Sequence, residues 1–295
     1  MFKVSVVTDE LSSDFETAAE LAAGWGISSI EIRGVGEERI GSLSPYALHH
    51  VKKVIEDYGL QVACVSPGIF KADHHRPVFD GWTVLKWQDR CEFEQQERQK
   101  QFIEHQVREV LPRTLEFCAG TGCRKIILFS FNKPGGAASR AEIPNYLFPY
   151  FTMACELAKP YDITLLIENE HICYGDTAAR TRKLIESVGA DNLKLNWDPG
   201  NAYFAGEQPY PSGYEQIRDL IGHVHMKDAV THSDGSKEYV VRGELDWESQ
   251  LKSLIHDGYD GYVSIETHCR PKVQSVYDTL RRILRIAGEG VLDAK

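Results

Sequence analysis

The strongest constraint on the fold of this chain is a regular alternation of two hydrophobic patterns. Short apolar runs rich in β-branched residues alternate eight times with segments whose apolar residues recur at helical spacing. The expected strands are 2–7, 28–33, 61–65, 125–129, 163–168, 193–197, 222–226 and 262–265. This pattern predicts an α/β protein, a single (β/α)8 TIM barrel over residues 1–295. A doubly wound open sheet is the alternative, but no turn spells GxGxxG or a Walker loop.

One stretch does not follow the alternation. Residues 66–91 contain Pro67-Gly68, His74-His75-Arg76-Pro77 and Gly81-Trp82, and they show neither strand nor helix periodicity. Loops of this length in a compact domain are often functional. We expect residues 66–91 to form a lid over a pocket, with a solvated or oligomer-contacting excursion as the alternative.

Charge and cysteine content restrict the partners and the compartment. The net charge is −10, from 43 acidic and 33 basic residues, and no basic block is present, so a nucleic-acid partner is disfavoured. The seven cysteines include no CxxC pair, which favours reduced thiols in the cytosol over a disulfide framework. No apolar run approaches the ~18 residues of a membrane span. We therefore expect a cytoplasmic protein without a membrane partner.

Polar residues of one parity mark the ends of the last four expected strands. They are Glu168 and Glu170, Asn196 and Asp198, His223, His225 and Lys227, and Ser264, Glu266 and His268. Helices cover the outside of a parallel barrel, so this parity points inward, at the active-site end. Taken singly, each residue could form an ordinary salt bridge or anchor a loop. Together they offer carboxylate oxygens and imidazole, which suit Mn, Co, Mg or Zn, and either a metal or bound protons must neutralise the carboxylates. We favour the metal.

At these strand ends the chain resembles a known family, the xylose-isomerase-like TIM barrels of sugar isomerases and epimerases. The resemblance lies in Ile167-Glu168-Asn169, Trp197-Asp198-Pro199-Gly200-Asn201, His223-Val224-His225-Met226-Lys227-Asp228 and Ile265-Glu266-Thr267-His268. It implies that Glu168, Asp198, His225 and Glu266 bind one divalent ion, with manganese favoured. It also implies that Glu168 and Glu266 are the catalytic acid/base pair, and that the protein is a homodimer or homotetramer.

The expected substrate is a small keto-sugar, polyol or sugar acid. A metal that chelates a carbonyl and the neighbouring hydroxyl acidifies the carbon-bound proton and stabilises the resulting enediolate. Return of the proton then gives an epimer or isomer, whereas loss of the hydroxyl makes the enzyme a dehydratase of the inosose or 3-dehydroshikimate type. The candidate substrate-binding residues are Asn201, Lys227, His268, Glu170 and Arg33, for each of which a structural hydrogen bond to a loop is the alternative.

One position departs from the family pattern. Many ketose epimerases of this family carry histidine three residues after the aspartate, where this chain has Asn201. Asparagine cannot act as an acid, so the sequence does not select an epimerase over its relatives.

Two other functional classes remain to be compared. A DNA-repair nuclease like endonuclease IV shares the barrel but needs a histidine-rich three-zinc site and a basic rim, which the acidic composition disfavours. A catalytically silent sugar-binding barrel would keep its ligand after Glu168→Gln and show no turnover in either form. Retention of a full acid/base pair around a buried cation argues against that class.

Overall fold

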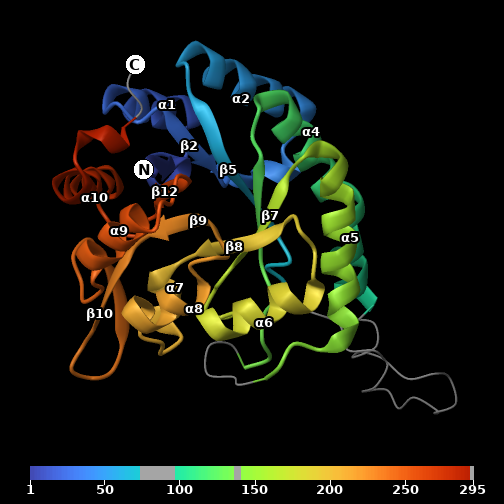
Figure 1. Cartoon of the computed structure of the whole chain (residues 1–295). Helices are drawn as coiled ribbons and strands as arrows, with labels where there is room; N and C mark the ends of the chain where they lie inside the picture. Colours follow the sequence, from blue (N-terminus) through green and yellow to red (C-terminus); the bar gives the residue numbers. More distant parts are fainter. Residues whose placement is uncertain (74–96, 136–140, 293–295) are drawn as a thin grey trace, which may run out of the picture.

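Eight parallel strands form a closed barrel with helices around it (Figure 1). The structure is a computed structural model, and it describes residues 1–73, 97–135 and 141–292. The barrel strands are β1 (Lys3–Val7), β2 (Ser29–Ile32), β5 (Gln61–Ile69), β6 (Lys125–Leu128), β7 (Thr164–Glu168), β8 (Leu193–Trp197), β9 (Ile221–Met226) and β12 (Tyr262–Ile265). They neighbour one another in chain order, and β12 pairs with β1 to close the ring. The (β/α)8 prediction is confirmed.

Helices cover the outside of the barrel. They are α1 (Phe15–Gly24), α2 (Pro45–Asp57), α4 (Leu111–Thr121), α5 (Phe148–Ala158), α6 (Ala178–Val188), α7 (Pro199–Phe204), α8 (Tyr214–Ile217), α9 (Trp247–His256) and α10 (Lys272–Ala287), with short helical turns at Thr8–Glu10, Ile40–Ser42, Gln106–Val110, Asn145–Leu147, Lys159–Tyr161, Pro209–Gly213 and Glu289–Val291. Side chains satisfy the first N–H groups of several helices; Asp14, for example, accepts from Thr17 N at 2.8 Å. In the described part of the chain, no helix is both long and apolar enough to cross a lipid bilayer.

The space enclosed by the strands is partly polar. Glu31 on β2 contacts His223 and His225 on β9, although β1 and β12 separate these two strands in the ring. These contacts therefore cross the inside of the barrel. Strand residues of the opposite parity, such as Ile30 and Val224, belong to the large apolar core. The strand parity deduced from the sequence thus separates a polar interior from an apolar layer under the helices.

The structure corrects the start of the predicted lid. Strand β5 runs through Ile69, which pairs with Leu128 of β6, so residues 66–69 belong to the barrel. Pro67, which cannot donate a ladder hydrogen bond, lies at an irregularity between Val65 and Ile69 where the register shifts. Residues 74–91 of the predicted lid lie outside the described residues.

Two hairpins at the mouth of the barrel were absent from the sequence prediction. They are β3 (Gly34–Val35) with β4 (Glu38–Arg39), and β10 (Asp228–Thr231) with β11 (Lys237–Val240). After the second hairpin the chain returns close to β10, where Glu244 N donates to Ala229 O at 2.8 Å. A Cβ at Gly243 would lie 2.0 Å from Ala229 O. Gly243 therefore permits a backbone approach that no larger residue allows.

We expect Gly243→Ala to lower the free energy of unfolding by roughly 1–3 kcal/mol, because the backbone must move to relieve the clash. Urea denaturation followed by circular dichroism measures the change. Gly24→Ala is the matched control, since a Cβ at Gly24 meets nothing within 4 Å. Equal unfolding midpoints for the two variants would contradict this prediction.

Candidate metal centre

Four side chains at the carboxyl ends of four strands converge. They are Glu168 at the end of β7, Asp198 after β8, His225 in β9 and Glu266 after β12. All four are buried, and one ligand atom from each lies within 4.8 Å of the other three. The distances from His225 Nδ1 are 3.0 Å to Glu266, 3.7 Å to Glu168 and 3.8 Å to Asp198. The strand ends therefore meet as the sequence indicated, while the metal-binding role of these residues stays a prediction.

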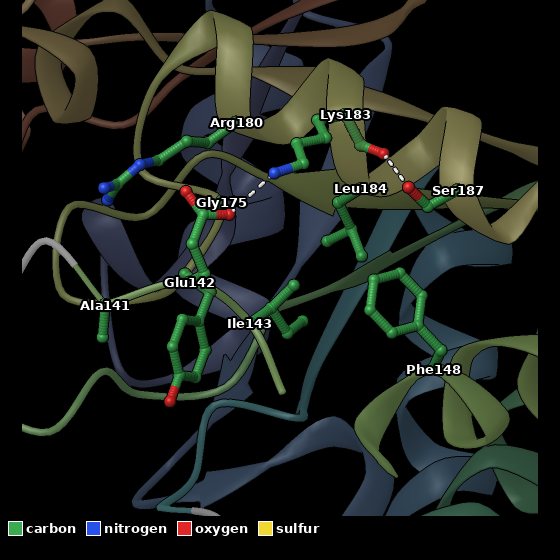
Figure 2. A pocket seen from close by; sticks show the side chains of 10 residues that line it. Ala141, Glu142, Ile143, Phe148, Gly175, Arg180, Lys183, Leu184 and Ser187 are labelled. Carbon is green, nitrogen blue, oxygen red and sulfur yellow. Dashed lines mark hydrogen bonds and ion pairs between the residues drawn. The ribbon is translucent and has the colours of Figure 1, made fainter. Parts of the chain in front are cut away.

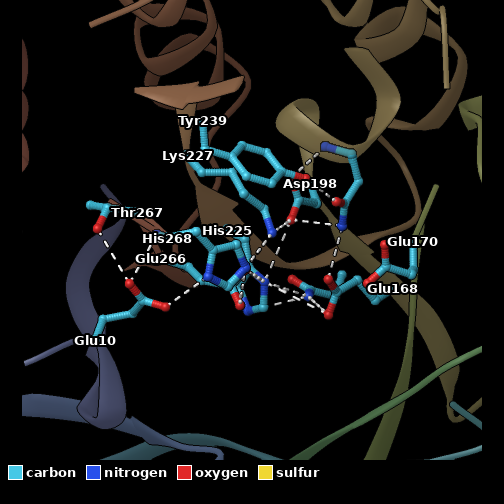
Figure 3. A network of polar contacts seen from close by, with 12 residues as sticks. Glu10, Glu168, Glu170, Asp198, His225, Lys227, Tyr239, Glu266, Thr267 and His268 are labelled. Atoms are coloured by element: carbon cyan, nitrogen blue, oxygen red, sulfur yellow. Dashed lines mark hydrogen bonds and ion pairs between the residues drawn. The ribbon is translucent and has the colours of Figure 1, made fainter. Parts of the chain in front are cut away.

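A lysine ammonium group already lies among these carboxylates. Lys227 Nζ is 2.8 Å from Asp198 Oδ2 and 2.7 Å from Glu266 Oε2 (Figure 3). Burial opposes its charge, but the two carboxylates outweigh burial and raise the pKa of Lys227 well above its usual value. A Cβ at Gly200 would lie 2.5 Å from Lys227 Cγ, so glycine leaves room for the lysine stem. The space between these carboxylates therefore favours a positive charge. The donor set of three carboxylates and one imidazole fits a divalent ion.

Glu31 contacts the imidazole of His225 from inside the barrel. His225 Nε2 lies 3.0 Å from Glu31 Oε1, and His223 Nε2 lies 2.9 Å from Glu31 Oε2 and from Ser264 Oγ. A carboxylate can only accept, so Nε2 of His225 carries the proton and Nδ1 faces the other ligands. Burial raises the pKa of Glu31, but the two histidines outweigh it and hold that pKa well below its usual value. Burial lowers the pKa of His223 to about 4, so His223 is neutral at pH 7.

Asn201 lies behind two of the ligands. Its Nδ2 donates to Glu168 Oε1 and to Asp198 Oδ2, both at 3.0 Å. Its Oδ1 accepts from the Tyr239 hydroxyl at 3.0 Å. Tyr239 belongs to the β10–β11 hairpin, which therefore helps to set the orientation of Asn201. Asn201 therefore orients the carboxylates of Glu168 and Asp198 through its amide N–H groups.

Glu266 is surrounded by basic groups. Arg33 Nη1 donates to Glu266 Oε1, and the same guanidinium pairs with Asp9 and Glu10, each at 2.9 Å. His268 Nε2 lies 3.4 Å from Glu266 Oε1, and its Nδ1 lies 2.9 Å from Glu10 Oε1. The backbone of His268 has φ 54°, a conformation that residues other than glycine seldom adopt. Its backbone N–H donates to Glu10 Oε2 at 2.9 Å. Glu10 thus positions His268 at the site.

The two glutamates differ in proton affinity. Burial raises the pKa of Glu168 to about 7, and the neighbouring charges of Glu266 and Asp198 act in the same direction. Burial also opposes ionisation of Glu266, but the charges of Lys227, His268, His225 and Arg33 outweigh it and lower its pKa well below the usual value. In the protein without a bound ion, Glu168 therefore retains a proton more readily than Glu266.

A cavity of about 340 Å³ opens beside these residues. Most of the predicted site residues line it, namely Arg33, Glu168, Glu170, Lys227, Glu266 and His268. Asp198, His225 and Asn201 lie behind them and support the lining side chains through the contacts above. A second pocket, between residues 141–148 and α6, has only about 30 Å³ of space and is crossed by the Lys183–Glu142 ion pair at 2.9 Å (Figure 2). It is too small for a sugar.

Comparison with known proteins places the chain in a family. Residues 19–286 match the family described as "Xylose isomerase-like TIM barrel". The chain belongs to this family. A curated relative, 3-dehydroshikimate dehydratase of Bacillus anthracis, is 31% identical over 104 residues, which are 35% of this chain and 36% of the relative. The curated relatives are thus matched over about half of their length or less.

Solved structures share the barrel over nearly its whole length. A D-tagatose 3-epimerase-like protein matches with a TM-score of 0.69 and 19% identity, covering 98% of this chain and 100% of that chain. The IOLI protein with a bound zinc atom matches with a TM-score of 0.69 and 14% identity, covering 99% of this chain and 100% of that chain. At these identities the likeness shows the fold alone. The proteins to which this chain is similar thus include an epimerase-like protein, by fold, and a dehydratase, by sequence over part of its length.

We expect Glu31→Gln to weaken divalent-metal affinity about 10- to 100-fold, because the amide no longer fixes the tautomer of His225. Isothermal titration calorimetry with Mn²⁺, Mg²⁺, Co²⁺ and Zn²⁺ measures the affinity. Glu20→Gln, an exposed glutamate on α1, is the control and should bind as the parent does. An unchanged dissociation constant in the Glu31 variant would show that Glu31 has no role in positioning the ligand.

Proposed function

We propose that this protein is a divalent-metal-dependent isomerase or epimerase of a small keto-sugar, polyol or sugar acid. The observation that carries the proposal is the convergence of Glu168, Asp198, His225 and Glu266 on one point at the edge of a polar cavity. A cavity of about 340 Å³ falls within the range of small-molecule sites. Its charged lining suits a polar, hydroxylated ligand. We propose manganese as the first metal to test.

The two cavity-lining glutamates are the proposed acid/base pair. A bound divalent ion supplies Lewis acidity that makes a proton beside the substrate carbonyl easier to remove. Glu168 comes from β7 and Glu266 from the end of β12, and β8 and β9 lie between these strands. The two carboxylates therefore approach the cavity from different parts of its wall, so one can remove a proton and the other can return it.

Neighbouring side chains prepare the pair for this exchange. Arg33 and Lys227 contact the carboxylate of Glu266 and stabilise its charged form. The amide of Asn201 fixes the direction of the Glu168 carboxylate. These contacts hold both groups before a substrate arrives, which reduces the reorganisation needed during proton transfer.

A dehydratase is the second candidate, and the curated relative of Bacillus anthracis favours it. Removal of the same carbon-bound proton starts both reactions. In the dehydratase, a neighbouring hydroxyl then leaves as water, and a group in the cavity must protonate it. Lys227 and His268 line the cavity and are the proposed proton donors for that step.

We expect Glu168→Gln and Glu266→Gln each to reduce turnover by at least about 100-fold, since each removes one partner of the proton transfer. The assay is proton NMR in deuterated water with the metal-loaded protein and a panel of ketoses, inososes and 3-dehydroshikimate. Solvent deuterium in an intact sugar indicates isomerase chemistry, and an olefinic or aromatic product indicates the dehydratase.

Glu207→Gln is the control, because Glu207 does not line the cavity. Its carboxylate instead accepts from Ala178 N, at the first residue of α6, at 2.9 Å. The proposal fails if the protein binds no divalent ion, or if both glutamine variants at the site turn over substrate at the parent rate.

A further inference from the structure

One wall of the cavity has no part in the proton transfer proposed above. It is formed by the β3–β4 hairpin and by residues in and after β5 and β6, and it includes Arg39, Ser66, Lys71 and Phe129. These side chains share the cavity with Glu168 and Glu266. A substrate held at the metal centre therefore extends toward them.

The basic groups of the cavity differ in how their charges are compensated. Arg33 pairs with Asp9 and Glu10, and Lys227 pairs with the carboxylates of the metal centre. Lys71 Nζ lies 2.6 Å from Glu170 Oε2. The side chain of Arg39, in contrast, makes no hydrogen bond or ion pair with the residues that the structure describes, although its backbone pairs with Gly34 in the hairpin. Within residues 1–73, 97–135 and 141–292, Arg39 is the arginine or lysine of the cavity lining whose side chain has no direct ion pair.

The guanidinium of Arg39 packs against the backbone of β5. A Cβ added to Gly68 would lie 3.7 Å from Arg39 Nε and 3.9 Å from Cζ, so the head group rests on this glycine. The side chain of Arg39 is exposed at the cavity; partial desolvation and the nearby charge of Arg33 lower its pKa, while the charges of Asp9, Glu168 and Glu266 act in the opposite direction. These carboxylates act from a distance and none pairs with the guanidinium, so its N–H donors remain available to an anion placed beside it in the cavity.

We infer that Arg39 binds a carboxylate of the substrate. A guanidinium offers two parallel N–H donors that match the two oxygens of a carboxylate. A phosphate carries more charge and would call for a second uncompensated cation, but Glu170 already neutralises Lys71. A single unpaired positive charge matches a single negative charge.

The inference rests on the proposed function and narrows its substrate class. In this proposal the reacting carbonyl and hydroxyl lie at the metal centre, and the acid group lies at the part of the cavity lined by the β3–β4 hairpin. The substrate is then a small hydroxylated keto acid in preference to a neutral sugar. The Arg39 wall would also orient the ring, because a two-point attachment fixes which carbon faces Glu168 and Glu266.

The test compares ligands that differ chiefly in the acid group. Calorimetry with the manganese-loaded protein measures the affinities of D-glucuronate against D-glucose, and of shikimate against myo-inositol. We expect at least one acid to bind more tightly than its neutral partner. Arg39→Met should weaken binding of that acid about 10- to 100-fold and leave the neutral compound unchanged.

Two further variants separate charge from geometry. Arg39→Lys keeps the charge but loses the paired donors, so it should give an intermediate loss. Lys71→Met, from the same wall, should weaken the acid less than Arg39→Met does, since the charge of Lys71 is already compensated. An unchanged Mn²⁺ affinity and melting temperature of Arg39→Met would show that the variant is folded.

The inference is wrong if no acid binds more tightly than its neutral partner, or if Arg39→Met affects both equally. Preferential Arg39-dependent binding of D-glucose 6-phosphate over D-glucuronate would also overturn it in favour of a phosphate subsite. Deuterium exchange into a neutral ketose by the same protein would then leave the proposed function intact. Failure of the proposed function itself appears separately, as an absence of metal binding or of any Glu168-dependent exchange.

Discussion

The arrangement of the site depends on how neighbouring basic groups compensate the charge of three buried carboxylates at the mouth of the barrel. Glu168, Asp198 and Glu266 are brought together by the closure of the ring, and their mutual repulsion is costly in a site that excludes water. Lys227 and Arg33 compensate part of this charge, and the imidazole of His225 faces the same point. The remaining side chains of the site can be understood as supports for these contacts.

Support comes from three directions, and each involves a different part of the fold. Glu31 reaches across the barrel from β2 and fixes the orientation of the His225 imidazole. The β10–β11 hairpin brings Tyr239 to Asn201, which directs two carboxylates. Glu10 holds His268 in a strained backbone conformation beside Glu266. Such contacts keep the proposed acid/base groups at fixed positions, which would favour proton transfer between them and a substrate.

Strand parity in the sequence was sufficient to predict the barrel and the meeting of four strand ends, because both follow from short-range periodicity and the geometry of parallel sheets. Glu31 escaped notice, although a charged residue inside the apolar run Ile30-Glu31-Ile32 was a visible signal. Its partners lie 192 and 194 residues away, on a strand that is not a neighbour, so only the closed ring reveals the contact. The return of the chain to β10 after the second hairpin was missed for a related reason: Gly243 permits a close backbone approach to Ala229 that spacing alone does not show.

The position of Lys227 has a consequence for how the protein matures. Since this ammonium group balances the acidic cluster from within, the chain can complete its folding while free metal is scarce. In the proposed function, a divalent ion would enter a folded barrel and would compete with this ammonium group for Asp198 and Glu266. A built-in counter-ion of this kind lowers the free-energy cost of burying the three carboxylates while the barrel folds.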